Sequence, residues 1–191
     1  MEISLIILIS YLLGSIPFGF LLTKFILKKD IREIGSGNIG ATNVLRTGNK
    51  IIGYSTLILD ILKAVIPILF IKMQLPEFIF ISSLAVFLGH VFPIWLKFNG
   101  GKGVATYVGI LFCINYILGF FFIATWLVVF FISKYSSLSS LLASFIIPIY
   151  YFFIDTENYY FFIIMFILIF YTHRENIKRL KNNTESKTKI Y

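Results

Sequence analysis

The sequence has little charge for its length and only one cysteine. Charged residues make up 14% of its 191 residues, whereas ordinary globular domains carry about 25%. Hydrophobic residues make up 58%, and the mean hydropathy is +0.89. This composition excludes an ordinary water-soluble domain and indicates an integral membrane protein. Cys113 lies inside an apolar run, so a disulfide within one chain is excluded and the thiol is predicted to be a poor nucleophile.

Several motifs for catalysis and metal binding are also missing. Leu96 stands where the first glycine of a nucleotide P-loop would have to precede Gly101 and Lys102, which excludes that motif. No Gly-x-Ser-x-Gly elbow occurs, and no His, Cys and carboxylate residues have the spacing of a metal site. We therefore predict neither a metal nor an organic cofactor. Because the apolar runs account for the composition, binding to nucleic acid is not expected.

Seven apolar segments are present in the sequence. The first three are long enough to span a membrane, which takes about 20 residues, whereas the fourth and fifth are short and could form one bent helix. Seven spans with the N-terminus outside place every basic residue except Lys63 and Lys72 on one side, and a fused fourth and fifth segment would break this positive-inside pattern. The segments are Ile3–Ile26, Ile51–Ile71, Phe78–Leu96, Val104–Leu118, Phe120–Ile132, Leu138–Ile154 and Tyr159–Thr172.

We therefore predict an all-α, polytopic membrane bundle of about seven transmembrane helices, with a cytoplasmic C-terminus. It forms one domain over residues 1–180, followed by a cytoplasmic tail over residues 181–191. The break between the fourth and fifth spans is expected near Asn115–Gly119.

The longest polar interval is Gly35–Arg46, here called the first loop. Its three glycines allow positive φ and let backbone N–H groups point inward. Its other side chains supply hydroxyl and amide groups and one planar guanidinium, which suits a two-oxygen anion. The pattern indicates a phosphate-binding loop, and a plain turn between two helices is the alternative. The residues concerned are Gly35, Ser36, Gly37, Asn38, Gly40, Thr42, Asn43 and Arg46.

A second glycine loop, Phe98–Thr106, follows the third span and contains Gly100, Gly101 and Lys102. Both loops follow odd-numbered spans, so they are expected on the same cytoplasmic side. Ser137 and Ser140 at the start of the sixth span and His173, Asn176 and Arg179 after the seventh belong to that side too. We therefore predict one site at the membrane–water boundary. A transporter of a phosphate ester or anion is the alternative, although transporters more often place polar groups at the midplane.

Two charged residues lie three apart within the second apolar segment, Asp60 and Lys63. A lone charge there would cost about 2.5–3.5 kcal/mol on insertion scales, so the two are expected to pair. The pair either braces the first loop or Arg46 from below, or holds its helix in register. His90, near the inner end of the third span, is either a hydrogen-bonded packing residue or part of the site.

These motifs resemble the bacterial acyl-phosphate:glycerol-3-phosphate acyltransferase family over nearly the whole chain. Asp60-x-x-Lys63 fits its second helix, and Asn183 departs from the glycine that the family usually has before the threonine, so the role of Glu185 is left open. The family's three motifs are matched by Ser36-Gly37-Asn38-Ile39-Gly40-Ala41-Thr42-Asn43-x-x-Arg46, by Gly89-His90-x-Phe92-Pro93 with Phe98-x-Gly100-Gly101-Lys102-Gly103-Val104-Ala105-Thr106, and by His173-x-x-Asn176-Ile177-x-Arg179-Leu180 with Glu185.

The resemblance implies acyl transfer from an acyl-phosphate to the 1-hydroxyl of glycerol 3-phosphate, giving lysophosphatidic acid for phospholipid synthesis in the bacterial inner membrane. Acyl-phosphate is already activated, so no covalent acyl-enzyme is expected, and orientation alone can supply about 7–11 kcal/mol. Neither histidine is followed by aspartate five residues on, which excludes the histidine–aspartate pair of thioester-using acyltransferases. Docking of an acyl-phosphate-forming enzyme on the basic face is left open.

The donor chemistry of these residues leads to a hypothesis for the role of each. Ser36, Asn38, Asn43 and Arg46 would bind phosphate and stabilise the developing oxyanion, and Lys102 with Gly100 and Gly101 would hold the acyl-phosphate or the leaving phosphate. Ser137 or Ser140, together with His173 and Asn176, would orient glycerol phosphate. Whether His173 or a phosphate oxygen of the substrate takes the proton is open. The remaining predicted substrate-binding residues are Gly37, Gly40, Thr42, His90, Arg179 and Glu185.

Overall fold

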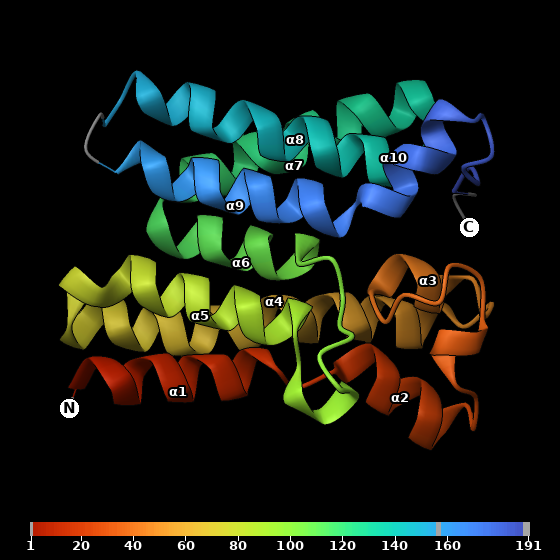
Figure 1. Cartoon of the computed structure of the whole chain (residues 1–191), viewed down its shortest axis with the longest axis horizontal. Coiled ribbons are helices and arrows are strands. Elements are labelled where there is room, and N and C mark those ends of the chain that lie inside the picture. Colours follow the sequence, from red (N-terminus) through yellow and green to blue (C-terminus); the bar gives the residue numbers. More distant parts are fainter. Residues whose placement is uncertain (1, 156–157, 189–191) are drawn as a thin grey trace. The chain divides into compact units, whose positions relative to one another are not determined.

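The computed structural model describes residues 2–155 and 158–188, and every regular element in these ranges is helical (Figure 1). The chain divides into two compact units, Met1–Ile114 and Asn115–Tyr191, which are described separately. Unit 1 contains α1 (Glu2–Gly14), α2 (Phe18–Ile26), η1 (Ile31–Glu33), α3 (Ala41–Leu45), α4 (Lys50–Gln74), η2 (Pro76–Phe78), α5 (Ile79–Val91), η3 (Ile94–Leu96) and α6 (Val104–Ile114). Unit 2 contains α7 (Tyr116–Ser133), α8 (Ser136–Phe152), α9 (Tyr159–Thr172) and α10 (Arg174–Lys181).

The distribution of polar and apolar side chains is inverted relative to a soluble protein. Met73 is 78% exposed and Ile132 is 81% exposed, whereas Asp60 and Lys63 are only 2% and 5% exposed. Three helical stretches, Glu2–Ile26, Pro76–Leu96 and Tyr116–Ser133, are long and apolar enough to cross a membrane by length and composition. An apolar solvent accounts for such a surface. The predicted class, an all-α integral membrane bundle, is confirmed, whereas the count of seven spans and the sidedness stay predictions.

The predicted segments differ in detail from the helices. The first segment is not one helix, because it breaks at Ser15–Pro17 between α1 and α2, where Pro17 has no N–H to continue the helical bonding. The fourth and fifth segments do separate, and the break lies at Asn115. The side chain of Asn115 accepts a hydrogen bond from the Ile117 N–H (2.9 Å) and so caps α7. This leaves α6 with 11 residues and α7 with 18.

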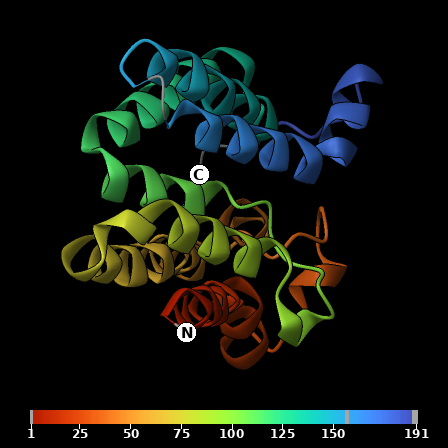
Figure 2. The same cartoon turned by 60° about the vertical axis from the view of Figure 1, so that its left-hand side comes forward.

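In unit 1, α4 and α5 lie side by side between α1 and α6 (Figures 1 and 2). α1 approaches α5 closely because small residues face each other. A Cβ on Gly14 would overlap the backbone of Val86, and the hydroxyls of Ser10 and Ser82 are 2.9 Å apart. This is the small-residue packing expected between helices in lipid, where no hydrophobic effect drives association.

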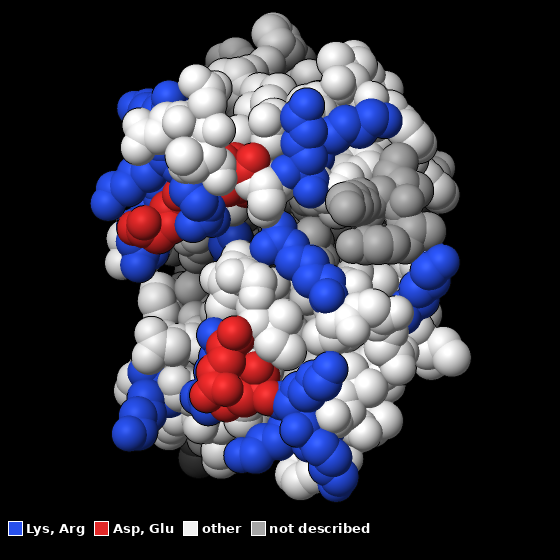
Figure 3. Space-filling model, turned by 90° about the vertical axis from the view of Figure 1, so that its right-hand side faces the viewer, with Lys and Arg blue, Asp and Glu red and all other residues white. Residues whose placement is uncertain are grey.

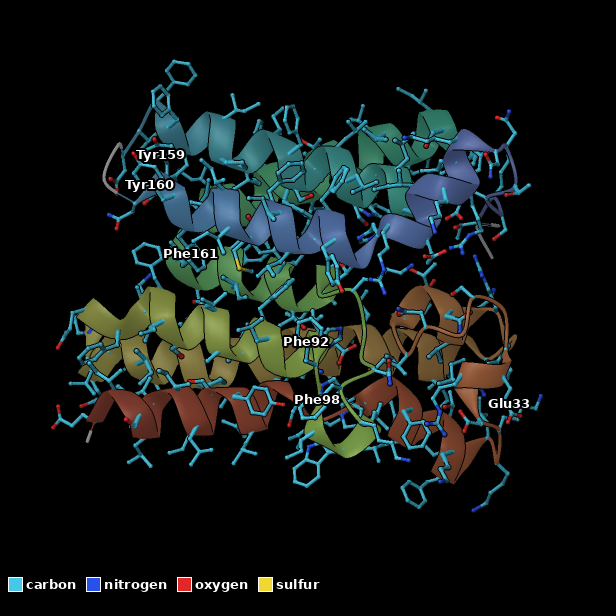
Figure 4. The ribbon with its side chains drawn as sticks, viewed as in Figure 1. Glu33, Phe92, Phe98, Tyr159, Tyr160 and Phe161 are labelled. Atoms are coloured by element: carbon cyan, nitrogen blue, oxygen red, sulfur yellow. The ribbon has the colours of Figure 1, made fainter. Side chains whose placement is uncertain are left out.

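In unit 2, α8 packs against both α7 and α9. The aromatic side chains of Tyr159, Tyr160 and Phe161 begin α9 at the end of this unit that is remote from α10 (Figure 4). Such aromatic residues are typical of a membrane–water interface. Beyond α10, the N–H of Thr184 donates to the carbonyl of Arg179 (2.8 Å) and that of Thr188 to Lys134 (2.9 Å), so this part of the predicted tail is attached to unit 2. Residues 189–191 lie outside the described residues.

Candidate active site

The first loop is held together from inside by one side chain, Asn43. Its Oδ1 accepts from the Ser36 N–H (3.0 Å), and its Nδ2 donates to the carbonyls of Ile31 (3.2 Å), Ile34 (2.8 Å) and Asn38 (2.8 Å). The residue is 3% exposed. Asn43 therefore shapes the loop, and the structure gives it the position of a brace rather than of the substrate contact predicted from the sequence.

The backbone of the first loop uses two of its three glycines for left-handed conformations. Gly35 has φ +58° and Gly37 has φ +71°, which side chains other than Asn and Asp seldom adopt. Gly40 instead has φ −77° and is the N-cap of the short helix α3, and its N–H donates to Asn38 Oδ1 (2.8 Å). The side chain of Arg46 lies against Gly35, where a Cβ would overlap it. The loop therefore holds the Arg46 side chain against Gly35, next to Ser36 in the sequence.

The second loop is anchored to the end of α5 through its backbone. The N–H of Gly100 donates to the carbonyl of Val91 (3.0 Å), and that of Gly101 donates to the carbonyl of His90 (3.1 Å). Because these two N–H groups are already bonded, they are not available as the phosphate donors expected from the sequence. The half-buried Lys102 follows directly and remains the candidate anion contact of this loop. Figure 4 shows Phe92 and Phe98, which lie on the segment leading from α5 into this loop.

The two loops come to the same end of unit 1. Leu96 of η3 leads into the second loop and packs in one hydrophobic cluster with Ile31 and Ile39, which flank and belong to the first loop, and with Val44 of α3. Figure 3 looks at the end of the helices that carries the first loop and shows Lys and Arg side chains gathered there. A substrate that carries phosphate would be attracted to such a surface.

Behind the second loop lies a buried polar group formed by Asp60, Lys63 and His90. Lys63 Nζ is 2.8 Å from Asp60 Oδ1, which confirms the predicted pairing geometrically, and also donates to the carbonyl of Ile16 (2.8 Å). His90 Nδ1 is 3.8 Å from Asp60 Oδ1, and the His90 ring is 3% exposed and lies against Gly101. We therefore place His90 behind the loop, as a supporting group, and not among the substrate contacts to which the sequence assigned it.

In unit 2, the carboxylate of Glu185 gathers three of the predicted site residues. Its Oε1 accepts from Ser137 Oγ (2.7 Å) and from Asn176 Nδ2 (2.7 Å), and its Oε2 accepts from Arg179 Nε (2.7 Å). A carboxylate would repel the phosphate of a substrate, and both oxygens are already bonded to protein donors. Glu185 therefore orients its neighbours and does not itself fit the predicted role of a substrate contact.

Asn183, two residues before Glu185, stands where the family usually has glycine, and its backbone conformation shows why asparagine can replace it. Asn183 has φ +55°, a left-handed conformation that asparagine tolerates better than most residues other than glycine. The turn that the family makes with glycine is therefore possible with Asn183, and Glu185 reaches Asn176 and Arg179.

The two serines predicted as alternatives are separated by the structure. Ser137 bonds to Glu185, whereas Ser140 lies nearly one turn further along α8, donates to the carbonyl of Ser136 (2.9 Å) and accepts from Trp126 Nε1 (3.1 Å). Ser140 therefore braces α8 against α7, and Ser137 is the better candidate for a substrate contact.

His173 lies at the junction of α9 and α10 and is fixed in one tautomer. Its Nδ1 is 2.8 Å from the carbonyl of Ile169. A carbonyl can only accept, so Nδ1 carries the proton and Nε2 is the acceptor nitrogen of the neutral ring. Asn176 is 4% exposed and, within the described part of the chain, its Oδ1 has no hydrogen-bond partner. Asn176 Oδ1 thus offers an acceptor of the kind that a substrate hydroxyl would need.

The Glu185 contacts make unit 2 sensitive to acid. Burial raises the pKa of the Glu185 carboxyl, but the hydrogen bonds from Ser137, Arg179 and Asn176 outweigh it and hold the pKa below its usual 4.5. A depressed pKa stabilises the fold above the unfolded-state value, and this stabilisation is lost as the pH falls through the folded-state value. We expect wild type to melt higher than Glu185→Gln at pH 7, and the difference to shrink below about pH 4.5. Thermal melting in detergent across pH 3–7 measures this, and a pH-independent difference would contradict it.

Helices with lipid-type surfaces, two glycine loops with basic side chains in unit 1 and a buried polar group around Glu185 in unit 2 define an integral membrane protein whose polar groups suit an anionic substrate. The family model described as glycerol-3-phosphate acyltransferase matches residues 4–183, and the chain belongs to this family. It is 69% identical over 191 residues, the full length of both chains, to the glycerol-3-phosphate acyltransferase of Pelagibacter ubique (strain HTCC1062). It is 50% identical over 190 residues to that of Bartonella henselae (strain ATCC 49882 / DSM 28221 / CCUG 30454 / Houston 1), covering 96% of this chain and 90% of the relative.

Two solved structures are similar as well. The crystal structure of PlsY (YgiH), an integral membrane glycerol 3-phosphate acyltransferase, in its glycerol 3-phosphate form aligns with a TM-score of 0.91 and 35% identity over 98% of this chain and 96% of that one. Its lysophosphatidic acid form aligns with a TM-score of 0.87 and the same identity, over 98% and 95% of the two chains. The predicted family and enzyme class are confirmed.

Proposed function

We propose that the protein transfers a fatty acyl group from an acyl-phosphate to the 1-hydroxyl of sn-glycerol 3-phosphate, which yields lysophosphatidic acid and inorganic phosphate. The similar structures in glycerol 3-phosphate and lysophosphatidic acid forms support the acceptor and the product. The chemistry supports the donor, because an acyl-phosphate is a mixed anhydride with a good leaving group. Such a donor needs orientation and charge neutralisation rather than a nucleophilic side chain.

In this reaction, unit 1 handles phosphate. The hydrophobic cluster around Leu96 holds the two loops at the same end of the unit. This end carries Ser36 and Arg46 on the first loop and Lys102 on the second. The guanidinium of Arg46 fits two phosphate oxygens, and the Lys102 ammonium neutralises charge that develops on the leaving group. Asn38, Thr42 and the glycines Gly37 and Gly40 shape the first loop around the anion.

Unit 2 handles the attacking hydroxyl, and the observation that carries this assignment is the geometry of Asn176. Glu185 fixes the orientation of the Asn176 amide by accepting a hydrogen bond from Nδ2. The buried Oδ1 is then an acceptor that has no partner in the described part of the chain. The substrate hydroxyl is a donor that would satisfy it. His173, with Nε2 as acceptor, and Ser137 complete the group. The hydroxyl proton then passes to His173 or to a phosphate oxygen of the substrate.

A single incubation tests the reaction. Purified protein with palmitoyl phosphate and labelled glycerol 3-phosphate is expected to form labelled lysophosphatidic acid and to release one phosphate per ester bond. Reconstitution in liposomes separates the alternative, because a phosphate-ester transporter would move the label across the bilayer without forming an ester. Label transport without product would overturn the proposal.

We further propose that the enzyme is a multi-pass protein of the bacterial inner membrane, with both groups of site residues at its cytoplasmic face. Single cysteines introduced at exposed Lys28, Lys97 and Lys178 in a Cys113→Ser background are expected to react with a membrane-impermeant maleimide only in inside-out vesicles. A cysteine at Glu77 is expected to react in intact spheroplasts. Opposite labelling of Lys28 and Lys178 would place the two groups on different sides of the membrane and overturn the proposal.

A further inference from the structure

The buried group Asp60, Lys63 and His90 contacts the break between α1 and α2, the start of α6 and the second loop. Lys63 Nζ donates to the carbonyl of Ile16 (2.8 Å), at the break between α1 and α2, and lies 5.9 Å from the ring centroid of Phe18. At the start of α6, Thr106 Oγ1 donates to the carbonyl of Asp60 (3.4 Å). The ion pair is therefore attached to the segments on both sides of α4.

His90 connects this buried group to the second loop. Its carbonyl accepts the N–H of Gly101 (3.1 Å), and its ring occupies the place that a Cβ on Gly101 would need. The same ring turns Nδ1 toward Asp60 Oδ1 at 3.8 Å, and this nitrogen has no hydrogen-bond partner within the described residues. Any movement of Asp60 would thus be passed through His90 to Gly101 and to the adjacent Lys102.

We propose that Asp60, Lys63 and His90 are positioning residues that set the place of the second loop, and with it the Lys102 ammonium, for a phosphate-bearing substrate. This rests on the proposed function, in which Lys102 holds phosphate. A buried ion pair seldom stabilises a fold more than apolar residues of the same size would. The packing of α1 on α5 already has its own contacts through Gly14 and the Ser10–Ser82 pair. Register alone therefore does not require the charges.

A double-mutant cycle separates positioning from mere structural support. The double variant Asp60→Asn/Lys63→Met removes both charges at once, so that no unpaired charge stays buried, and keeps similar volumes. We expect it to raise, at least about tenfold, the KM of the same substrate whose KM is raised by Lys102→Ala. Combined with Lys102→Ala, it should add less than about threefold, because a lysine that is gone cannot be misplaced. Gly101→Ala, which displaces the His90 ring, should raise the same KM.

Ile68→Val is the matched control, because Ile68 is fully buried on the same helix, α4, but does not contact the loop through the ion pair. It should lower the melting temperature and leave both KM values unchanged. Fully additive losses, or an unchanged KM in Asp60→Asn/Lys63→Met and in Gly101→Ala, would overturn the positioning role while leaving the proposed function intact. An active Lys102→Ala enzyme with unchanged KM values would overturn the role of Lys102 and with it the positioning proposal, whereas absence of ester formation by the wild-type protein would overturn the proposed function itself.

Discussion

Replacing Lys102 by alanine is expected to lower kcat/KM about 100-fold, which corresponds to about 2.7 kcal/mol of lost transition-state stabilisation. A charge-assisted hydrogen bond to phosphate lies in this range. The effect should be large because the N–H groups of Gly100 and Gly101, next to Lys102, already donate to the carbonyls of Val91 and His90. Steady-state kinetics with palmitoyl phosphate and labelled glycerol 3-phosphate measure the loss.

The segment that leads into the second loop offers a matched control. Lys97 carries the same charge on η3's C-cap but is exposed and left-handed (φ +51°), and its side chain is not required by the proposed site. Lys97→Gly removes the charge in a conformation that glycine adopts without strain, and it should keep kcat/KM within about twofold of wild type. Equal losses in Lys97→Gly and Lys102→Ala would show that only the general positive potential matters.

For unit 1, the sequence indicated which residues form the two glycine loops but not how the loops are bonded internally. Glycine, asparagine and arginine at fixed spacing led to the prediction of phosphate contacts on the two loops, because these residue types have few other uses in an apolar chain. It did not predict that Asn43 would be a brace, since a side-chain amide can bond its own backbone or a ligand equally well. Burial and the carbonyls of Ile31, Ile34 and Asn38 decide between the two, and these depend on the folded loop.

The hydrogen bond from Lys63 to the carbonyl of Ile16 could not be predicted from residue spacing either. The i, i+3 spacing predicted the pairing, but not that Lys63 would reach the carbonyl of Ile16, 47 residues earlier in the chain. A signal existed in Pro17, because a proline in an apolar run breaks the helix and changes the bonding of nearby carbonyls. That break would have predicted a carbonyl acceptor between α1 and α2 that a buried donor such as Lys63 could satisfy.

In unit 2 the sequence pointed to the polar residues that lie together but not to the hydrogen bonds that connect them. Ser137 and Ser140 could not be distinguished, because both lie near the start of the same helix and only tertiary contacts with Glu185 and Trp126 separate them. The role of Glu185 depended on whether Asn183 could make a glycine-type turn. The observed φ of +55° answers this in favour of the turn and makes Glu185 the organiser of the group.

The second large effect is expected from replacing Asn176, which Glu185 orients. Asn176→Ala should lower kcat/KM for glycerol 3-phosphate about 100-fold, mainly through kcat, because Oδ1 is expected to bond the hydroxyl most strongly as it attacks. The fold should survive, since Glu185 keeps its bonds to Ser137 and Arg179. Kinetics at varied glycerol 3-phosphate, together with a melting curve, measure both quantities.

Two further substitutions show whether the loss comes from the acceptor atom itself. Asn182→Ala removes an exposed amide at the C-cap of α10 and should leave kcat/KM unchanged. Asn176→Asp keeps an oxygen acceptor but loses the Nδ2 donor and sets a second negative charge against Glu185, so the acceptor should turn away and activity should fall as far as in Asn176→Ala. If Asn176→Asp kept wild-type activity, the Oδ1 acceptor would not depend on Glu185 for its orientation. The catalytic geometry of unit 2 would then have to be set by something other than that carboxylate.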